Sequence, residues 1–209
     1  MTQNQQGQMS ENMQAGPVTP EMNHGGHELF DVQELLSGAV AGLNQCVLLR
    51  PHIQDQELLT MLDNQFQFMQ EEYNIIVDCF KTGQDPFKPT QSYKMSQNND
   101  FIYGIKPTQP KKPIQSANEL TDEIISGFLL GVHKTSASLK AMVALETTNP
   151  VVRRVIADSV PNCIEMAYEV SIYQNKHQYY QVPQLAKQDM MAIVNSFAPS
   201  QIKPGTMPN

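Results

Sequence analysis

The stretch QELLTMLDNQFQFMQEEYNIIVDCFKTG, residues 56–83, decides the fold of this 209-residue chain. Its large apolar residues follow one another at alternating spacings of three and four, a pattern typical of one face of an amphipathic α-helix. Gly83 ends the pattern, since glycine often stands just beyond a helix C-terminus. We predict a helix over about residues 54–81 with one stripe facing a core. The stripe consists of Leu59, Leu62, Phe66, Met69, Tyr73, Ile76 and Phe80.

The segment before this helix shows a similar pattern. It begins near Glu28 and ends near Arg50-Pro51, because a proline disfavours helical backbone in the residue before it. Only a few residues then separate the two predicted helices, so they should form an antiparallel hairpin. The predicted core stripe of this first helix is Leu29, Val32, Leu36, Ala39, Leu43 and Cys46.

Two further helical patterns follow residue 116. The third helix should begin between Ser116 and Thr121, and the fourth should begin at Pro150 behind the cap residue Asn149. Pro161 lies inside the fourth helix, where it should remove one backbone hydrogen bond and bend the helix. The predicted stripes are Ile125, Phe128, Val132, Thr135, Leu139 and Met142, then Val152, Ile156, Ser159, Cys163, Met166, Val170 and Tyr173.

Residues 83–116, called the strap below, contain five prolines and no helical periodicity. A loop of this length is unusual in a compact domain, but a helical bundle can use one as a crossover along its whole length. We expect aromatic and apolar side chains of the strap to hold it against the helices. These are Phe87, Tyr93, Phe101, Ile102 and Tyr103.

The two hairpins also resemble each other in sequence. Glu34-Leu35-Leu36-Ser37-Gly38 matches Glu123-Ile124-Ile125-Ser126-Gly127, and Gly42 matches Gly131. Chance could produce so short a match. If it is a true repeat, the hairpins pair about a pseudo-two-fold axis, with these small residues at close helix contacts.

Together these patterns predict an all-α chain, with a ferritin-like antiparallel four-helix bundle over residues 27–182. Two αα-hairpins joined by the proline-rich strap would build it. Residues 1–26 form a Gln-, Asn- and Met-rich arm that we expect to be disordered, since it lacks large aliphatic residues. Residues 183–209 form a tail with one possible short helix near residues 184–197.

Charge and cysteine content limit the possible partners. A net charge of −7 and a pI of about 5.2 argue against a nucleic-acid or anionic-membrane partner. We expect no secretory signal and no membrane span, because no apolar run approaches the roughly 20 residues that cross a bilayer. Cys46, Cys79 and Cys163 are expected to be half-buried apolar residues of a protein made in the cytosol, or late cross-linking points between molecules.

A ferritin-like bundle raises the question of a metal centre. Such centres use Glu-x-x-His pairs, but Ile75 and Tyr168 stand where histidines would follow Glu72 and Glu165. By helical geometry these two glutamates and His133 lie beside the predicted stripes, so we expect solvated positions. The alternative is a degenerate metal site formed by Glu72, Glu165 and His133. We otherwise expect no metal, no cofactor and no catalytic residue.

Several strings in the chain resemble one known family. They are residues 80–86 (FKTGQDP), 88–93 (KPTQSY), 149–154 (NPVVRR) and 173–177 (YQNKH). All four are similar to the coat F family of spore coat proteins, and the resemblance covers roughly residues 25–185. It implies a ferritin-like fold, expression in the mother-cell cytoplasm during sporulation, and a final place in the spore coat. It implies no catalytic residues.

The function expected from this resemblance is a non-catalytic, structural one. Its partners would be other spore coat proteins, with self-association possible because only 17% of residues are charged. Tyr179, Tyr180 and exposed Gln and Lys side chains could serve as cross-linking points, or the two tyrosines could simply cap the bundle. The alternatives are a metal-dependent oxidoreductase of ferritin or manganese-catalase type, and an adaptor that recruits another coat protein through the strap.

Overall fold

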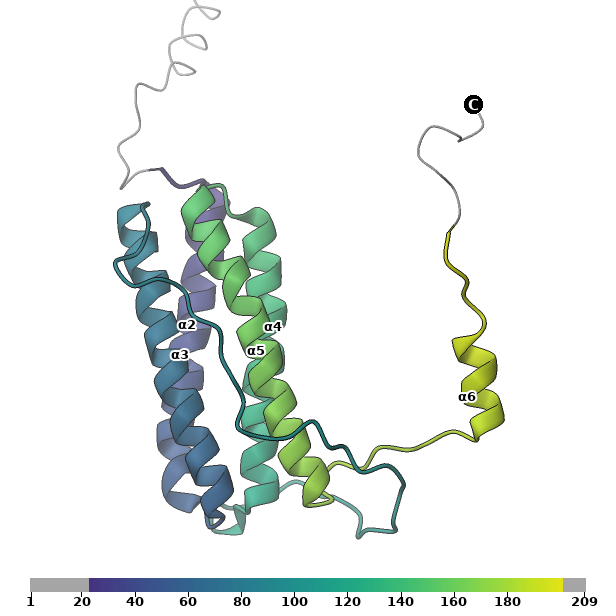
Figure 1. Cartoon of the computed structure of the whole chain (residues 1–209). Coiled ribbons are helices and arrows are strands. Elements are labelled where there is room, and N and C mark those ends of the chain that lie inside the picture. The colour runs from purple at the N-terminus through teal and green to yellow at the C-terminus, as the bar shows by residue number, and fades with distance from the viewer. Residues whose placement is uncertain (1–22, 201–209) are drawn as a thin grey trace, which may run out of the picture.

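Four long helices lie side by side in the computed structural model, which describes residues 23–200 (Figure 1). Within this range the chain is helical and has no named strand, so the predicted all-α class is confirmed. An isolated β-bridge joins Tyr103 and Val182. The long helices are α2 (Gly26–Leu49), α3 (Gln56–Thr82), α4 (Asp122–Glu146) and α5 (Pro150–Lys176).

Three short elements complete the described chain. The 3-10 turn η2 (Arg50–His52) leads into α3, and the 3-10 turn η3 (Ala117–Glu119) precedes α4. The short helix α6 (Lys187–Val194) follows the bundle, inside the segment where the sequence suggests one. Residues 1–22 of the predicted arm lie outside the described residues. Its last residue, Gly26, is already the first residue of α2.

The helix ends follow the capping residues. Asn149 Oδ1 accepts hydrogen bonds from Val151 N at 2.9 Å and Val152 N at 3.1 Å, and Pro150 opens α5 as predicted. Gly83 adopts a left-handed conformation with φ of 65° and ends α3, which confirms the sequence prediction. Thr121 caps α4, so that helix begins at the later end of the predicted range.

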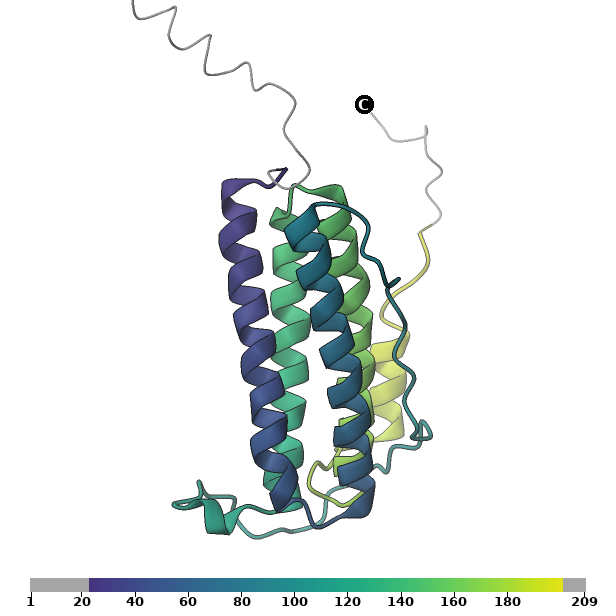
Figure 2. The same cartoon turned by 90° about the vertical axis from the view of Figure 1, so that its left-hand side faces the viewer.

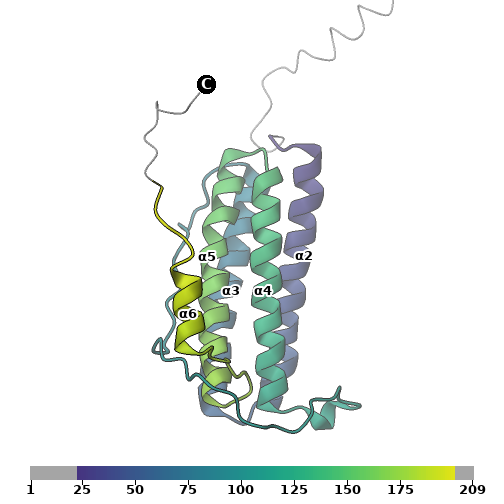
Figure 3. The ribbon, with the colours of Figure 1, turned by 90° about the vertical axis from the view of Figure 1, so that its right-hand side faces the viewer.

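The order of the helices follows from the two kinds of connection. Short turns join α2 to α3 and α4 to α5, whereas the strap returns along the length of the bundle before α4 begins (Figures 1 and 2). Each long helix packs against two main neighbours: α2 against α3 and α4, and α5 against α3 and α4. Figure 3 shows the α2 and α4 side of this arrangement.

The core consists of two apolar clusters separated by a polar layer. One cluster, toward the start of α2, includes Val32, Leu35, Ile75, Ile76, Cys79, Val143, Val152, Val155 and Ile156. The other, toward the end of α2, includes Cys46, Leu58, Met61, Leu62, Ile125, Leu129, Leu130, Val170 and Tyr173. Between them, buried polar residues are contributed by α3, α4 and α5: Gln65, Glu72, His133, Lys140, Asn162 and Glu169.

The predicted core stripe is right for α5, is largely right for α2 and α3, and is shifted in α4. Every predicted α5 residue is buried, and α5 continues through Pro161. In α4, by contrast, Phe128 and Met142 are exposed while the neighbouring Leu129 and Val143 are buried. A shift of one position turns a helix by about 100°. The α4 stripe is wrong because it followed apolar residues alone, whereas part of this core is polar and part of the apolar surface is exposed.

The strap is held by polar contacts more than by the predicted side chains. Asn162 Oδ1 accepts a hydrogen bond from Tyr93 N at 2.9 Å, and Asn175 Oδ1 accepts one from Ile102 N at 2.6 Å. Of the predicted apolar anchors, Tyr93 is half-buried and Phe101 packs near Tyr168. The prediction is wrong for three others, whose side chains are exposed: Phe87, Ile102 and Tyr103.

Helix α2 is more apolar than its burial requires. The described part of the chain contains one helical segment, Gly26–His52, that is both long enough and apolar enough to cross a membrane. Its mean hydropathy is 1.2. A helix packed in a bundle can meet the same criteria of length and composition. Only 22% of its most apolar window is buried, so α2 leaves apolar surface open on the outside of the bundle.

Candidate functional site

The structure places the residues of the suggested metal site differently from the sequence prediction. Glu72 and His133 are buried in the polar layer, so their predicted solvated positions are wrong. Glu165 is half-buried. Among residues 23–200, no three His, Cys, Asp or Glu side chains gather closely enough to hold a metal ion. Glu72, Glu165 and His133 therefore do not form one site.

An ion pair between Lys140 and Glu72 occupies the centre of the polar layer. The Lys140 ammonium donates to Glu72 Oε2, and Asn162 Nδ2 donates to Glu72 Oε1 at 3.0 Å. Lys140 Nζ also lies 3.3 Å from Cys163 Sγ. Burial alone would lower the pKa of Lys140, but the attraction of Glu72 and Cys163 outweighs it and raises that pKa. Lys140 is therefore a charged ammonium at neutral pH.

His133 lies in the same polar layer, seven residues before Lys140 on α4, and is uncharged. Its Nε2 is 2.7 Å from Gln65 Oε1, while its Nδ1 is buried without a hydrogen-bond partner in the described residues. Burial, followed by repulsion from Lys140, lowers the pKa of His133 from 6.5 to about 3. Because Gln65 Oε1 can only accept, Nε2 carries the proton of the neutral ring.

Glu169 joins the polar layer to the strap. Its carboxylate accepts hydrogen bonds from Gln65 Nε2 at 2.9 Å and from the Tyr93 hydroxyl at 2.5 Å. Ser96 donates to the other carboxylate oxygen, through its backbone N at 2.7 Å and its Oγ at 2.9 Å. Burial and the Glu169 carboxylate raise the pKa of the Tyr93 hydroxyl. Tyr93 therefore stays protonated and can act as a donor.

The polar layer does not suit a carboxylate-bridged metal centre. The carboxylates of Glu72 and Glu169 already accept hydrogen bonds from neighbouring side chains and backbone. The Lys140 ammonium supplies the positive charge that a metal ion would bring, and it would repel a second cation. The arrangement can hold α3, α4, α5 and the strap in register.

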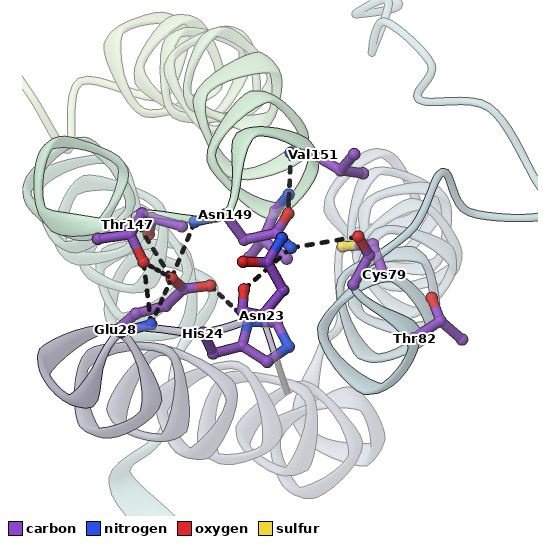
Figure 4. Close-up of polar contacts among 12 residues, drawn as sticks. Asn23, His24, Glu28, Cys79, Thr82, Thr147, Asn149 and Val151 are labelled. Carbon is purple, nitrogen blue, oxygen red and sulfur yellow. Dashed lines mark hydrogen bonds and ion pairs between the residues drawn. The ribbon is translucent and has the colours of Figure 1, made fainter. Parts of the chain in front are cut away.

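A third buried carboxylate, that of Glu28, ties the two hairpins together at one end of the bundle (Figure 4). Glu28, on the first turn of α2, accepts hydrogen bonds from Thr148 N at 2.9 Å, Thr148 Oγ1 at 2.6 Å and Asn149 N at 3.0 Å. His24 Nδ1 lies 2.7 Å from the other oxygen of the same carboxylate. The result is a clamp between the start of α2 and the turn from α4 to α5.

Asn149 extends this clamp to the end of α3. Its Nδ2 donates to Gly83 O and to Asn23 O, both at 3.2 Å, while its Oδ1 caps α5. Burial raises the pKa of Glu28, but hydrogen bonds from Thr148, His24 and Asn149 outweigh it and lower that pKa. The Glu28 carboxylate is therefore ionised at neutral pH, and its role is structural.

The cysteines are placed for packing. Cys46, Cys79 and Cys163 are all buried and form no disulfide. Burial raises the pKa of Cys46 to about 11 and that of Cys79 to about 12, so neither is a reactive thiolate at neutral pH. The suggested cross-links between molecules through these thiols would require the bundle to open, because all three thiols are buried.

Comparison with known proteins gives a family for this helical chain. A curated relative, the Spore coat protein F-like protein YhcQ of Bacillus subtilis (strain 168), is 50% identical over 206 residues. The match covers 99% of this chain and 92% of the relative. The chain belongs to the coat F family. The Coat F domain model matches residues 121–183, which include α4 and α5 of this coat F protein. No solved structure matches it.

The sequence contained a signal for the polar layer that apolar periodicity overlooks. Each of three helices carries two buried polar residues seven positions apart: Gln65 and Glu72, His133 and Lys140, Asn162 and Glu169. Seven residues make almost two full helical turns, so each pair lies on one face. A search for such polar pairs would have found the layer. Glu28 was recognisable only as the first acidic residue of α2.

Proposed function

We propose that this coat F protein is a non-catalytic structural component of the spore coat. It would be made in the mother-cell cytoplasm during sporulation and would then assemble with other coat proteins. The observation that carries this proposal is the near full-length similarity to a protein named as spore coat protein F-like. The engagement of the Glu72 and Glu169 carboxylates by Lys140 and neighbouring donors supports a structural role over metal-dependent oxidation.

We also propose that the bundle is ferritin-like, with two hairpins joined by a crossover. The order of the helices and the course of the strap support this fold. In a metal-binding bundle of this kind, carboxylates on facing helices hold the cations. Here Lys140 would take over the charge of the metal, so the fold keeps a compact polar layer without a metal-dependent activity.

The adaptor hypothesis receives less support. The strap uses its own backbone to bind Asn162 and Asn175 of α5, and Tyr93 and Ser96 bind Glu169. These groups are therefore engaged within the molecule. Partners would instead meet the outer faces of the helices and the tail.

A fluorescent fusion followed through sporulation tests the proposed location. We expect diffuse mother-cell signal first, and then a shell around the forespore that persists on the released spore. Signal that stays diffuse until the mother cell lyses would contradict the proposal.

Metal titration of the purified protein tests the absence of an oxidoreductase role. Adding Fe²⁺ or Mn²⁺ to the wild-type protein should leave its Tm unchanged and should produce no peroxide consumption. A rise in Tm that saturates with either metal, accompanied by peroxide turnover, would favour the oxidoreductase alternative.

A further inference from the structure

The tail helix α6 exposes an apolar face, of which Met190 is half-buried. Met190, Ile193 and Val194 follow the spacing i, i+3 and i+4 on α6, and Phe197 follows three residues after its end. Ile193 is 57% exposed, Val194 69% and Phe197 85%, and α6 has no buried residue. Figure 1 shows α6 clear of the four long helices. This spacing is the pattern by which an amphipathic helix inserts into an apolar groove.

The outer face of α2 and α4 contains a groove of suitable chemistry. Its volume is about 690 Å³, and its lining has no Asp or Glu. Leu48 and Phe128 stand exposed along it. Four glycines, one pair from each helix, lie in its lining: Gly38, Gly42, Gly127 and Gly131. Because glycine has no side chain, a third helix could approach closely here.

The matching glycines of the internal repeat explain why the groove is open. A Cβ added at Gly42 would lie 3.0 Å from Val132 Cγ1, so this glycine does allow the close contact of α2 with α4. A Cβ added at Gly131 would meet nothing within 4 Å. Gly131 therefore faces open space, and the groove lacks the third layer of side chains that would fill it.

The chain directs α6 away from its own bundle. Val182 O accepts a hydrogen bond from Gly104 N at 2.8 Å, and Gln181 makes two hydrogen bonds with the backbone of Lys106. Pro183 follows at once; it fixes its own φ and favours extended backbone at Val182. The tail is thus anchored to the strap up to Val182, and α6 projects outward from there.

We propose that α6 of one molecule docks into the α2–α4 groove of a second molecule. The apolar face of α6 supplies the anchors, and the glycine-lined groove accepts them without burying an unpaired charge, because its one lysine, Lys140, is paired with Glu72. Because helix and groove occupy different parts of the surface, this contact is head-to-tail. Head-to-tail contacts that do not close a ring generate open chains, as a coat layer requires. The biological meaning of this contact rests on the proposed coat function.

Sedimentation velocity of the purified full-length protein tests this contact with two complementary variants. Ile193→Asp/Val194→Asp places charge on the docking face of α6, and Gly131→Arg fills the groove. Both changes lie on open surface, and arginine is a better helix former than glycine, so the bundle should keep its helical circular dichroism. Gln188→Asp, on the opposite face of α6, and Gly131→Ala are the matched controls.

The wild-type protein and both controls should form concentration-dependent species larger than dimers. Each docking variant alone should remain monomeric. An equimolar mixture of the two should form only a 1:1 dimer, because one partner keeps an intact helix and the other an intact groove.

Three results would overturn the proposal. They are a wild-type protein that stays monomeric at every concentration, a docking variant that assembles like the wild type, or a mixture that stays monomeric. Docking of α6 in its own groove would give the first of these. If self-association is not found, the proposed location in the spore coat is unaffected. If the protein is absent from the coat, a measured self-association remains valid.

Discussion

The ion pair of Lys140 and Glu72 is the residue-scale feature on which the account of the core depends. Both side chains are about nine-tenths buried, with apolar clusters on either side. Burying two charges is costly, and only close pairing and further hydrogen bonds offset the loss of hydration. Asn162 and Cys163 supply those further contacts. Removing one charge leaves the other buried and unpaired.

We predict that Lys140→Met lowers the free energy of unfolding by about 3–5 kcal/mol, the usual result of leaving a buried charge alone. Glu72→Gln should also destabilise, and the double variant should lose at least about 1 kcal/mol less than the sum of the two. Urea unfolding followed by circular dichroism measures all three. Lys134→Met, at an exposed position of α4, is the control. Additive losses would show that the two charges do not depend on each other.

His133 predicts a loss of stability in mild acid. Its pKa is about 3 in the folded protein and 6.5 ordinarily, so the unfolded chain binds a proton over a range where the folded chain does not. Its contribution is therefore complete above pH 6.5 and decreases as the pH falls toward 3. Between pH 7 and 5 the wild type should lose about 2 kcal/mol more than His133→Gln, which keeps a donor for Gln65.

Unfolding curves at several pH values check this. His27→Gln, on the exposed start of α2, should keep the wild-type pH dependence. If His133→Gln shows the same slope of stability against pH as the wild type, His133 does not titrate as described.

At the scale of elements, the ends of the helices are tied together by polar groups. Glu28 connects α2 to the turn between α4 and α5, and Asn149 adds the end of α3. These contacts join residues more than 60 positions apart in sequence. The clamp therefore fixes how the two hairpins meet, which apolar packing alone would specify less strictly.

We predict that Glu28→Gln lowers the free energy of unfolding by about 1–3 kcal/mol, since several buried donors lose a charged acceptor. The lowered pKa of Glu28 adds a second expectation. Its contribution is present above the ordinary value of 4.5 and disappears as the pH falls through the folded pKa, so the variant should lose less stability in that range. Glu34→Gln, on the exposed face of α2, is the control. Equal losses for both variants would contradict the clamp.

Helix boundaries could be predicted from sequence because their causes are local. Gly83, Asn149 and Pro150 act on the backbone beside them, whatever lies elsewhere in the fold. The buried polar positions of α3 and α4 could not be predicted in the same way. Their burial depends on partners such as Lys140 for Glu72, which only the folded chain brings together. An apolar pattern also cannot distinguish a core face from an open outer groove.

At the scale of the whole molecule, the strap closes the polar layer from outside. Tyr93 and Ser96 reach Glu169, and the backbone of the strap binds Asn162 and Asn175. The sequence indicated a long crossover from its prolines, but not these contacts, because the predicted anchors were apolar. The strap is therefore fixed to the bundle, and the amides that make these hydrogen bonds, those of Tyr93, Ser96 and Ile102, should be protected from exchange with solvent.

We predict that Tyr93→Phe increases hydrogen exchange of the backbone amides in the strap by about 10-fold, since one hydrogen bond to a charged group is lost. The long helices should exchange as in the wild type. Tyr103→Phe, whose side chain is exposed, should leave exchange unchanged. Mass spectrometry of deuterium uptake measures both. Unchanged protection in Tyr93→Phe would mean that the strap is held by its other contacts alone.

The central claim, a structural place in the spore coat, is tested most directly by quantitative mass spectrometry of fractionated spores. Coat extract, spore core and mother-cell lysate would be compared for peptides of this chain. We expect strong enrichment in the coat extract. Recovery only from the soluble lysate, with none in the coat extract, would contradict it.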